Sequence, residues 1–216
     1  MSENTLKVCE IFSSIQGESS FAGLPCAFVR LAGCALNCRW CDTAYARRES
    51  SEMTLDEIAA VVRGFGQPLV EITGGEPLEQ AASIDLMKMF LGDGLEVLLE
   101  TNGAKDISKV PSGVRRIMDI KCPSSGMAGR MLWSNFSYIT SGDEVKFVVA
   151  GREDFAYALK VIEQYHLVQR CPVLLAPVWG ELEPAHLAGW ILESALPLRL
   201  QIQMHKIIWG MEARGV

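Results

Sequence analysis

The sequence predicts an α/β fold built on parallel strands, in one domain that spans residues 1–216. Short β-type runs alternate with amphipathic segments, and their starts lie mostly about 20 to 30 residues apart, the period of a strand–helix unit. The length corresponds to roughly one and a half domains of about 150 residues, which favours one compact domain or a partial barrel. Such a chain buries about 70% of its unfolded surface, so it needs no disulfides to fold.

Seven segments are expected to form strands, because each is a short run rich in Val, Ile, Leu or Phe with polar, Gly or Pro residues near its ends. They are separated by stretches long enough for a crossover connection rather than a hairpin turn. The segments are 26–31, 69–73, 95–101, 115–120, 145–150, 173–178 and 198–203.

Four segments between these strands are expected to be helices. The first begins with Thr54 and Glu57, spaced as a capping box, and Ile58, Val61 and Val62 continue it as an apolar stripe. The others are 83–91, 154–165 and 184–194, the last with a proline in its first turn. Two further stretches, 13–25 and 122–143, are predicted to be long loops, and long loops on an α/β scaffold tend to carry function.

The charge balance argues against some partners. Lys and Arg total 20 and Asp and Glu total 26, so the net charge is −6. A mildly acidic chain is a poor direct partner for duplex nucleic acid or an anionic membrane. The N-terminal residues lack the pattern of a secretory signal, and no apolar run approaches the roughly 20 residues that cross a bilayer. We therefore expect a cytoplasmic protein whose cysteines stay reduced.

Three of the seven cysteines are clustered. Cys34, Cys38 and Cys41 have the spacing C-x3-C-x2-C on a predicted loop, 33–43, that follows the first predicted strand. Three thiolates can bind three corners of a [4Fe–4S] cluster and leave the fourth iron open to a substrate or cofactor. Zinc bound by three ligands, or three buried core cysteines, are the alternatives. The remaining Cys and His residues are scattered along the chain, at Cys9, Cys26, Cys122, Cys171, His166, His186 and His205.

With Trp40 directly before the last cysteine, this loop resembles the cluster motif of the radical S-adenosylmethionine (SAM) enzymes. The resemblance implies that SAM chelates the open iron and is cleaved reductively to a 5′-deoxyadenosyl radical, which abstracts a hydrogen atom from the substrate. Gly74-Gly75-Glu76, after the next predicted strand, resembles the motif that receives the SAM amino group. The expected SAM contacts are Trp40, Asp42, Gly75, Glu76, Lys121 and Ser124. Lys121 could instead snorkel from the rim of the barrel.

Four segments narrow the resemblance to one family within the radical SAM enzymes. They are 10–18, 28–34, 41–43 and 201–210. Together they resemble the 7-carboxy-7-deazaguanine synthases, a radical SAM family. This resemblance implies a partial (β/α) barrel of TIM type, reduced in helices, and a carbon–nitrogen lyase. The implied reaction contracts 6-carboxy-5,6,7,8-tetrahydropterin to 7-carboxy-7-deazaguanine and releases ammonia, in queuosine and 7-deazapurine biosynthesis. It also implies a homodimer and a flavodoxin-like electron donor.

A pterin presents an amide-like edge and a carboxylate, and the family resemblance assigns residues to both. Gln16, Gly17 and Glu18 would read the aminopyrimidinone edge, Arg30 would clamp the carboxylate through a bidentate fork, and His205, at the end of the last predicted strand, would donate or carry a proton. Taken singly, Gln16 and Glu18 could be polar residues of a loop, Arg30 could belong to an ordinary ion pair, and His205 could lie on the rim of the barrel. Ile15, Thr73 and a C-terminal substrate-binding segment, 198–216, complete the expected substrate wall.

The resemblance also implies Mg²⁺, with Thr43 as a ligand. A hydroxyl, substrate oxygens and waters make a suitable site for this hard cation. Thr43 could instead cap the following turn.

Two other functions compete with the synthase. A glycyl-radical-enzyme activase has the same cysteine spacing but acts on a protein, and the loop at Gln16–Glu18 with the Gln203-x-His205 pair argues against it. A non-enzymatic zinc or iron–sulfur binding module is the second alternative.

Overall fold

The computed structural model describes residues 4–211 and 213–216 and contains a nine-stranded sheet in the order β3-β1-β2-β4-β5-β6-β7-β8-β9. Strands β2 and β4 to β9 run parallel to one another, whereas β1 is antiparallel to both of its neighbours, β2 and β3. The strands are β1 (Thr5–Ile15), β2 (Pro25–Leu31), β3 (Ser51–Thr54), β4 (Leu69–Gly74), β5 (Glu96–Thr101), β6 (Arg115–Ile120), β7 (Glu144–Val149), β8 (Val173–Pro177) and β9 (Arg199–Leu200).

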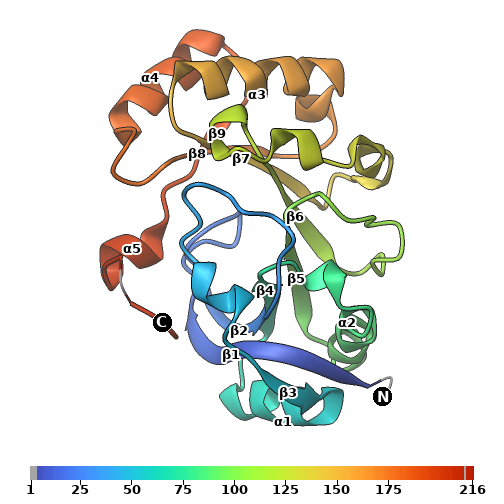
Figure 1. Cartoon of the computed structure of the whole chain (residues 1–216). Coiled ribbons are helices and arrows are strands. Elements are labelled where there is room, and N and C mark those ends of the chain that lie inside the picture. Colours follow the sequence, from blue (N-terminus) through green and yellow to red (C-terminus); the bar gives the residue numbers. More distant parts are fainter. Residues whose placement is uncertain (1–3, 212) are drawn as a thin grey trace.

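The α-helices flank the sheet, with α1 and α2 beside its first half and α3 and α4 beside its last strands (Figure 1). They are α1 (Leu55–Phe65), α2 (Ser83–Gly92), α3 (Arg152–Gln164), α4 (Pro184–Ser194) and α5 (Met204–Ile208). All four predicted helices are confirmed, and Thr54 and Glu57 form the capping box that starts α1. The connection from β5 to β6 has no α-helix, and that from β6 to β7 has only short 3₁₀ helices. The barrel is therefore reduced in helices, as predicted.

Three sequence predictions need correction. The sequence reading missed β1 and β3, and the predicted loop 13–25 begins inside β1. β3 lacks an apolar pattern because it is an exposed edge strand. The predicted strand 198–203 shrinks to the two residues of β9, which pair with β8 at the other edge of the sheet. The predicted loop 122–143 contains three 3₁₀ helices, Pro123–Ser125, Ala128–Arg130 and Trp133–Tyr138.

Alternate residues of each parallel strand face opposite sides of the sheet. One face packs against the helices in the main hydrophobic core, to which β4 contributes Val70 and Ile72. The other face carries a smaller apolar cluster, Cys26, Phe28, Leu69, Leu98 and Ile117. Beyond that cluster, toward the carboxyl ends of the strands, the same face carries charged side chains. In the described part of the chain, no helix has the length and apolarity that a membrane crossing requires.

Candidate active site

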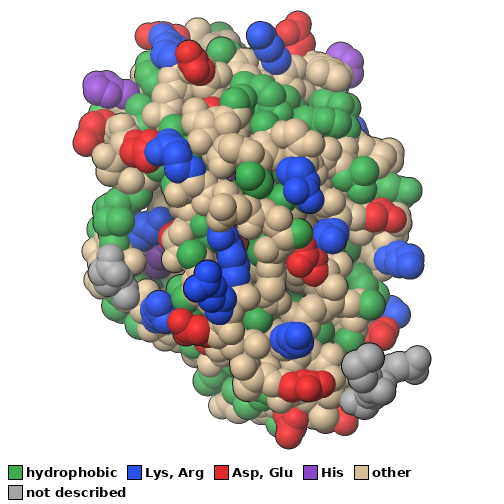
Figure 2. Space-filling view, in the orientation of Figure 1, with side chains coloured by type: hydrophobic (Ala, Val, Ile, Leu, Met, Phe, Trp, Pro, Cys, Tyr) green, Lys and Arg blue, Asp and Glu red, His purple; other side chains and the backbone are tan. Residues whose placement is uncertain are grey.

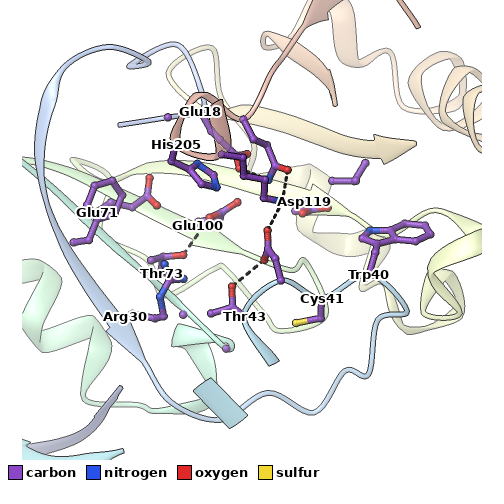
Figure 3. Close-up of a pocket in the computed structure, with 18 of the residues that line it drawn as sticks. Glu18, Arg30, Trp40, Cys41, Thr43, Glu71, Thr73, Glu100, Asp119 and His205 are labelled. Atoms are coloured by element: carbon purple, nitrogen blue, oxygen red, sulfur yellow. Dashed lines mark hydrogen bonds and ion pairs between the residues drawn. The ribbon is translucent and has the colours of Figure 1, made fainter. Parts of the chain in front are cut away.

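A cavity of about 560 Å³ opens at the carboxyl ends of the parallel strands. Its walls are the cysteine loop, the turn after β1, the ends of β4 to β8, and the segment that follows β9. In Figure 3, Glu71, Thr73, Glu100 and His205 lie toward one side of this cavity, and Trp40 and Cys41 toward the other. This is the end of a parallel barrel where active sites form, and the volume suits a small-molecule ligand.

The two glycines after β4 bring that strand close to the cysteine loop. A Cβ on Gly75 would lie 1.9 Å from the Gly33 carbonyl oxygen, and one on Gly74, whose φ is +139°, would lie 2.1 Å from that of Leu31. Backbone hydrogen bonds run from the Gly75 N–H to Leu31 and from the Glu76 N–H to Gly33. The close packing of the two backbones therefore requires glycine at both positions.

The three clustered cysteines are free thiols that line this cavity. Cys34 and Cys38 are half-buried and Cys41 is exposed. Burial raises the pKa of Cys34 and Cys38, while the Asn102 amide beside Cys34 and the Lys121 ammonium near Cys38 act in the opposite direction. The Asn102 Nδ2 donates to the Cys34 sulfur at 3.6 Å.

The donor set fits a cluster, since thiolates hold iron–sulfur clusters and hydrogen bonds to sulfur tune them. In the described residues, no three His, Cys, Asp or Glu side chains are close enough to share one metal ion. A cubic cluster binds each of three cysteines to a different iron, so it does not require the three sulfurs to share one metal ion.

Two expected SAM contacts, Glu76 and Ser124, are not among the residues that line the cavity. Glu76 is fully buried, and its carboxylate accepts hydrogen bonds from Thr101 Oγ1 at 2.8 Å and from the Asn102 and Leu78 N–H groups at 2.7 and 3.1 Å. Its side chain therefore fixes the end of β5 beside the cysteine loop. Ser124 also lies outside the cavity lining, where its N–H bonds to the Asp154 carboxylate at 3.0 Å.

The other expected SAM residues line the cavity. The Arg39 guanidinium stacks over the Trp40 ring, 4.9 Å from its centroid, and forms a bidentate pair with Glu181 at 2.8 and 2.7 Å. Lys121 pairs with Asp119 at 2.9 Å. Burial lowers the pKa of Lys121, but the Asp119 carboxylate outweighs burial and the pKa is raised. Lys121 is thus a fixed cation close to Cys38.

The turn after β1 presents Gln16 and Glu18 to the cavity. Gln16 is buried; its Nε2 donates to Glu71 at 2.5 Å and its Oε1 accepts from the Glu18 N–H at 3.1 Å. The Glu18 carboxylate pairs with the Lys146 ammonium at 2.7 Å and accepts hydrogen bonds from the side-chain amides of Gln201 and Gln203 at 2.6 and 2.7 Å. Burial raises the pKa of Glu18, but Lys146 and these hydrogen bonds outweigh burial and lower it.

Gly17 packs directly on His205. A Cβ on Gly17 would lie 2.7 Å from the His205 Nδ1, so only glycine fits without a shift. His205 lies in the first turn of α5, not at the end of a strand as predicted, because β9 ends at Leu200. Burial lowers the pKa of His205, which favours the neutral imidazole at pH 7.

Arg30 and Thr73 occupy the same wall, and Ile15, the last residue of β1, also lines the cavity. The Arg30 Nε is held by Glu10 at 2.6 Å, and the Tyr45 hydroxyl donates to the same carboxylate oxygen at 2.7 Å. Thr73 Oγ1 donates to Glu100 at 3.1 Å.

The sequence reading missed a group of buried charges in this wall. Lys146, 3% exposed, contacts Glu18, Glu100 and Asp119. Burial and the Glu100 carboxylate raise the pKa of Glu71 to about 8. A charged residue at an alternate position of an otherwise apolar strand is a signal that could have identified them.

Comparisons with known proteins agree with this site. The radical SAM superfamily profile matches residues 29–169, so the fold and the three-cysteine loop are those of a radical SAM protein. A curated 7-carboxy-7-deazaguanine synthase of Chlorobaculum tepidum is 46% identical over 99% of both chains. Another, from Koribacter versatilis, is 39% identical over 98% of this chain and all of that relative. The chain belongs to the 7-carboxy-7-deazaguanine synthase family.

Solved structures show the same fold. The crystal structure of QueE from Escherichia coli superposes with a TM-score of 0.78 at 21% identity and covers 92% of this chain and 94% of that one. The Streptococcus suis SuiB structure superposes with a TM-score of 0.55 at 12% identity, over 79% of this chain and 47% of that one.

Proposed function

We propose that the chain is a radical SAM lyase that converts 6-carboxy-5,6,7,8-tetrahydropterin to 7-carboxy-7-deazaguanine and ammonia. Beyond family membership, one observation carries the proposal: the turn at Gln16–Glu18 and His205 close the same cavity that the three cysteines line. A cavity with thiolates at one side and amide, carboxylate and imidazole groups at the other suits a radical source facing a polar heterocycle.

Cys34, Cys38 and Cys41 would hold a [4Fe–4S] cluster, with SAM beside Trp40, Asp42, Gly75 and Lys121. When bound, the cluster and SAM supply the radical that takes hydrogen from pterin C6 and later returns it. The chain provides the surroundings: Lys121 places a positive charge near Cys38, and the Asn102 amide donates to Cys34. Both interactions favour the negative charge of a thiolate-bound cluster.

The substrate wall offers matched groups for a carboxypterin. Glu10 holds the Arg30 Nε and so fixes the plane of the guanidinium, which leaves the terminal nitrogens for the substrate carboxylate. Glu18 and Gln16, with the Gly17 backbone, meet the aminopyrimidinone edge. Ring contraction releases ammonia, so protons must move, and neutral His205 in the same wall can accept one.

The proposal includes Mg²⁺ at Thr43. The Thr43 hydroxyl donates its proton to Asp42 at 2.9 Å, so its lone pairs point away from that carboxylate and can ligate a cation. It also includes a homodimer, a flavodoxin-like electron donor and a cytoplasmic location, where thiols stay reduced.

The test is anaerobic turnover by the protein with its cluster reconstituted, supplied with reductant, SAM, Mg²⁺ and carboxytetrahydropterin. We expect 7-carboxy-7-deazaguanine and ammonia in equal amounts, without net consumption of SAM. Cys38→Ala, which removes one cluster ligand, should abolish both SAM cleavage and product. Failure of the intact, iron-loaded protein to form the deazapurine would refute the proposal, and SAM cleavage only with a partner polypeptide would favour an activase.

A further inference from the structure

An ion pair joins the cysteine loop to the segment after β9. Lys206 of α5 places its Nζ 2.8 Å from the Oδ2 of Asp42, the residue after Cys41. The Lys206 side chain is 9% exposed, whereas 48% of the Asp42 side chain is open, on the cavity side.

Hydrogen bonds continue from this pair into the substrate wall. The Lys206 Nζ donates to Gln203 Oε1 at 2.6 Å, and Gln203 Nε2 donates to Glu18 at 2.7 Å. At the other end, Asp42 accepts the Thr43 hydroxyl at 2.9 Å. Contacts therefore lead without a break from Thr43, expected to bind Mg²⁺, to Glu18, expected to read the pterin.

The segment that carries Lys206 is anchored at its start, where Gln201 and Gln203 both donate to Glu18, and is largely exposed beyond that start. None of the five residues of α5, all of them described, is fully buried, and Ile207 and Ile208 are 62% and 50% exposed. Backbone hydrogen bonds from Gln201 to Leu175 and from Met204 to Gly17 secure its start. Figure 2 shows Lys or Arg and His side chains in a hollow beside this segment. Beyond those anchors the segment has little burial and opens locally at low cost, so the Lys206–Asp42 ion pair adds a hold that the later residues otherwise lack.

We propose that Lys206 is a positioning residue that makes the binding of pterin and the binding of SAM depend on each other. The inference rests on the proposed function. Asp42 belongs to the wall expected to hold SAM, and Glu18 belongs to the wall expected to hold pterin. A ligand that orders one wall favours the paired state of Lys206 and thereby orders the other. Such coupling is reciprocal, so each ligand strengthens the binding of the other by the same factor.

The coupling is measured on the cluster-loaded protein. SAM affinity is followed through the change that SAM binding causes in the electron paramagnetic resonance signal of the reduced cluster, with and without carboxytetrahydropterin. In the unmodified protein pterin should tighten SAM binding about fivefold or more, and in Lys206→Met this ratio should fall close to one. Lys206→Arg, which keeps the charge, should restore most of the ratio. Lys88→Met, at an exposed pair on α2, is the matched control and should leave the ratio unchanged.

A double-mutant cycle assigns the effect to the ion pair. If Lys206 acts through Asp42, the Asp42→Asn and Lys206→Met double variant should lose no more coupling than the more affected single variant. In Lys206→Met the KM for pterin should rise by a larger factor than kcat falls, because the variant loses the alignment of the substrate and keeps every group that reacts. Additive losses in the cycle, or coupling that survives in Lys206→Met, would overturn the inference.

Hydrogen exchange separates this inference from the proposed function, because it needs no pterin. Amides of residues 201–209 should exchange about tenfold faster in Lys206→Met than in the unmodified protein, while those of β4 and β5 should not change, which also shows that the variant is folded. Faster exchange in a protein that does not turn over pterin would refute the function but keep the ion pair as anchor. Unchanged exchange would refute the inference even if turnover succeeds.

Discussion

At the scale of the residue, Arg30 stands where β2 enters the cysteine loop, with its Nε fixed by Glu10. We predict that Arg30→Ala weakens pterin binding about ten- to a hundredfold, since a hydrogen-bonded charge contributes about 1.5–3 kcal/mol. SAM affinity should hardly change. Equilibrium binding of each ligand to the cluster-loaded protein measures both effects.

Arg30→Lys is the control for charge. It retains the cation but not the planar fork, so its pterin affinity should fall between those of the unmodified protein and Arg30→Ala. Equal weakening of pterin and SAM binding in Arg30→Ala would remove this residue from the substrate wall.

Glu71 is a second residue whose surroundings give a test. Burial first, and then the Glu100 carboxylate, raise its pKa from 4.5 to about 8. Between these values the unfolded chain has released the proton that the folded chain retains, so the free energy of unfolding falls as pH rises through this range. The Gln16 Nε2 donates to the Glu71 Oε2 at 2.5 Å, and a carboxyl oxygen can accept this hydrogen bond whether or not the group is protonated.

We predict that Glu71→Gln removes this part of the pH dependence. Urea unfolding at about pH 6 and about pH 9 should show a smaller loss of stability in the variant than in the unmodified protein. The difference between the two proteins isolates Glu71 from the thiols and histidines that also titrate. A variant with the same pH dependence as the unmodified protein would show that Glu71 ionises normally in the folded state.

At the scale of the element, the packing of β4 on the cysteine loop depends on Gly75. A Cβ there would lie 1.9 Å from the backbone oxygen of Gly33, which cannot rotate away. We predict that Gly75→Ala lowers the free energy of unfolding by about 2 kcal/mol or more, as strained packing does, and lowers cluster occupancy. Thermal unfolding and the iron content after reconstitution measure the two effects.

Gly64 provides the matched control. It lies within α1, and a Cβ there would meet no atom within 4 Å. Gly64→Ala should therefore stabilise the helix by about 0.5–1 kcal/mol. If Gly75→Ala behaved like Gly64→Ala, the close approach of the two backbones would be wrong.

Elements with a strong local signal could be predicted from the sequence. The helices 83–91 and 184–194 were placed within about a residue of α2 and α4, because periodicity and a first-turn proline mark them locally. β3 and β9 were missed or misjudged because edge strands acquire their conformation from a neighbour rather than from an apolar pattern.

The residues of the candidate site also divide into those that the sequence predicts and those that only the folded chain brings together. The cysteine spacing by itself indicates a metal-binding loop, and the loop at Gln16–Glu18 is a contiguous motif that the family resemblance identifies. Lys146 and Glu71 come from separate strands, and only the folded sheet brings them to the same wall. Glu76 belongs to a motif, yet its hydrogen bonds to Thr101 and Asn102 depend on the position of the next strand. Sequence spacing carries no information on such partners.

At the scale of the whole molecule, the sheet face that borders the cavity changes from apolar to charged along the direction of the strands. Apolar side chains fill the end nearest the starts of the strands, and charged side chains gather at the other end, around Lys146. A buried cation with three carboxylate neighbours holds the turn after β1, β5 and β6 together. Because all three also line the cavity, the shape of the cavity depends on this charge.

We predict that Lys146→Met lowers the free energy of unfolding by about 3 kcal/mol, because it leaves the partly buried carboxylates of Glu18 and Glu100 without their cation. The loss should be larger at pH 8 than at pH 5. In the unmodified protein the pKa of Glu18 is lowered, so this carboxyl stabilises the fold above its unfolded pKa of about 4.5 and the stabilisation is lost as pH falls. Without Lys146 burial dominates, the pKa of Glu18 rises, and its contribution reverses sign.

Denaturant unfolding at the two pH values measures the effect, and Lys160→Met is the control. Lys160 is an exposed residue of α3, and a surface substitution of this kind changes stability by about 0.5 kcal/mol or less. The pH dependence separates loss of the buried cation from loss of packing, because a packing defect costs the same at both pH values. A Lys146→Met protein that is destabilised equally at pH 5 and pH 8 would show that Lys146 fills space in the wall and does not balance its charge.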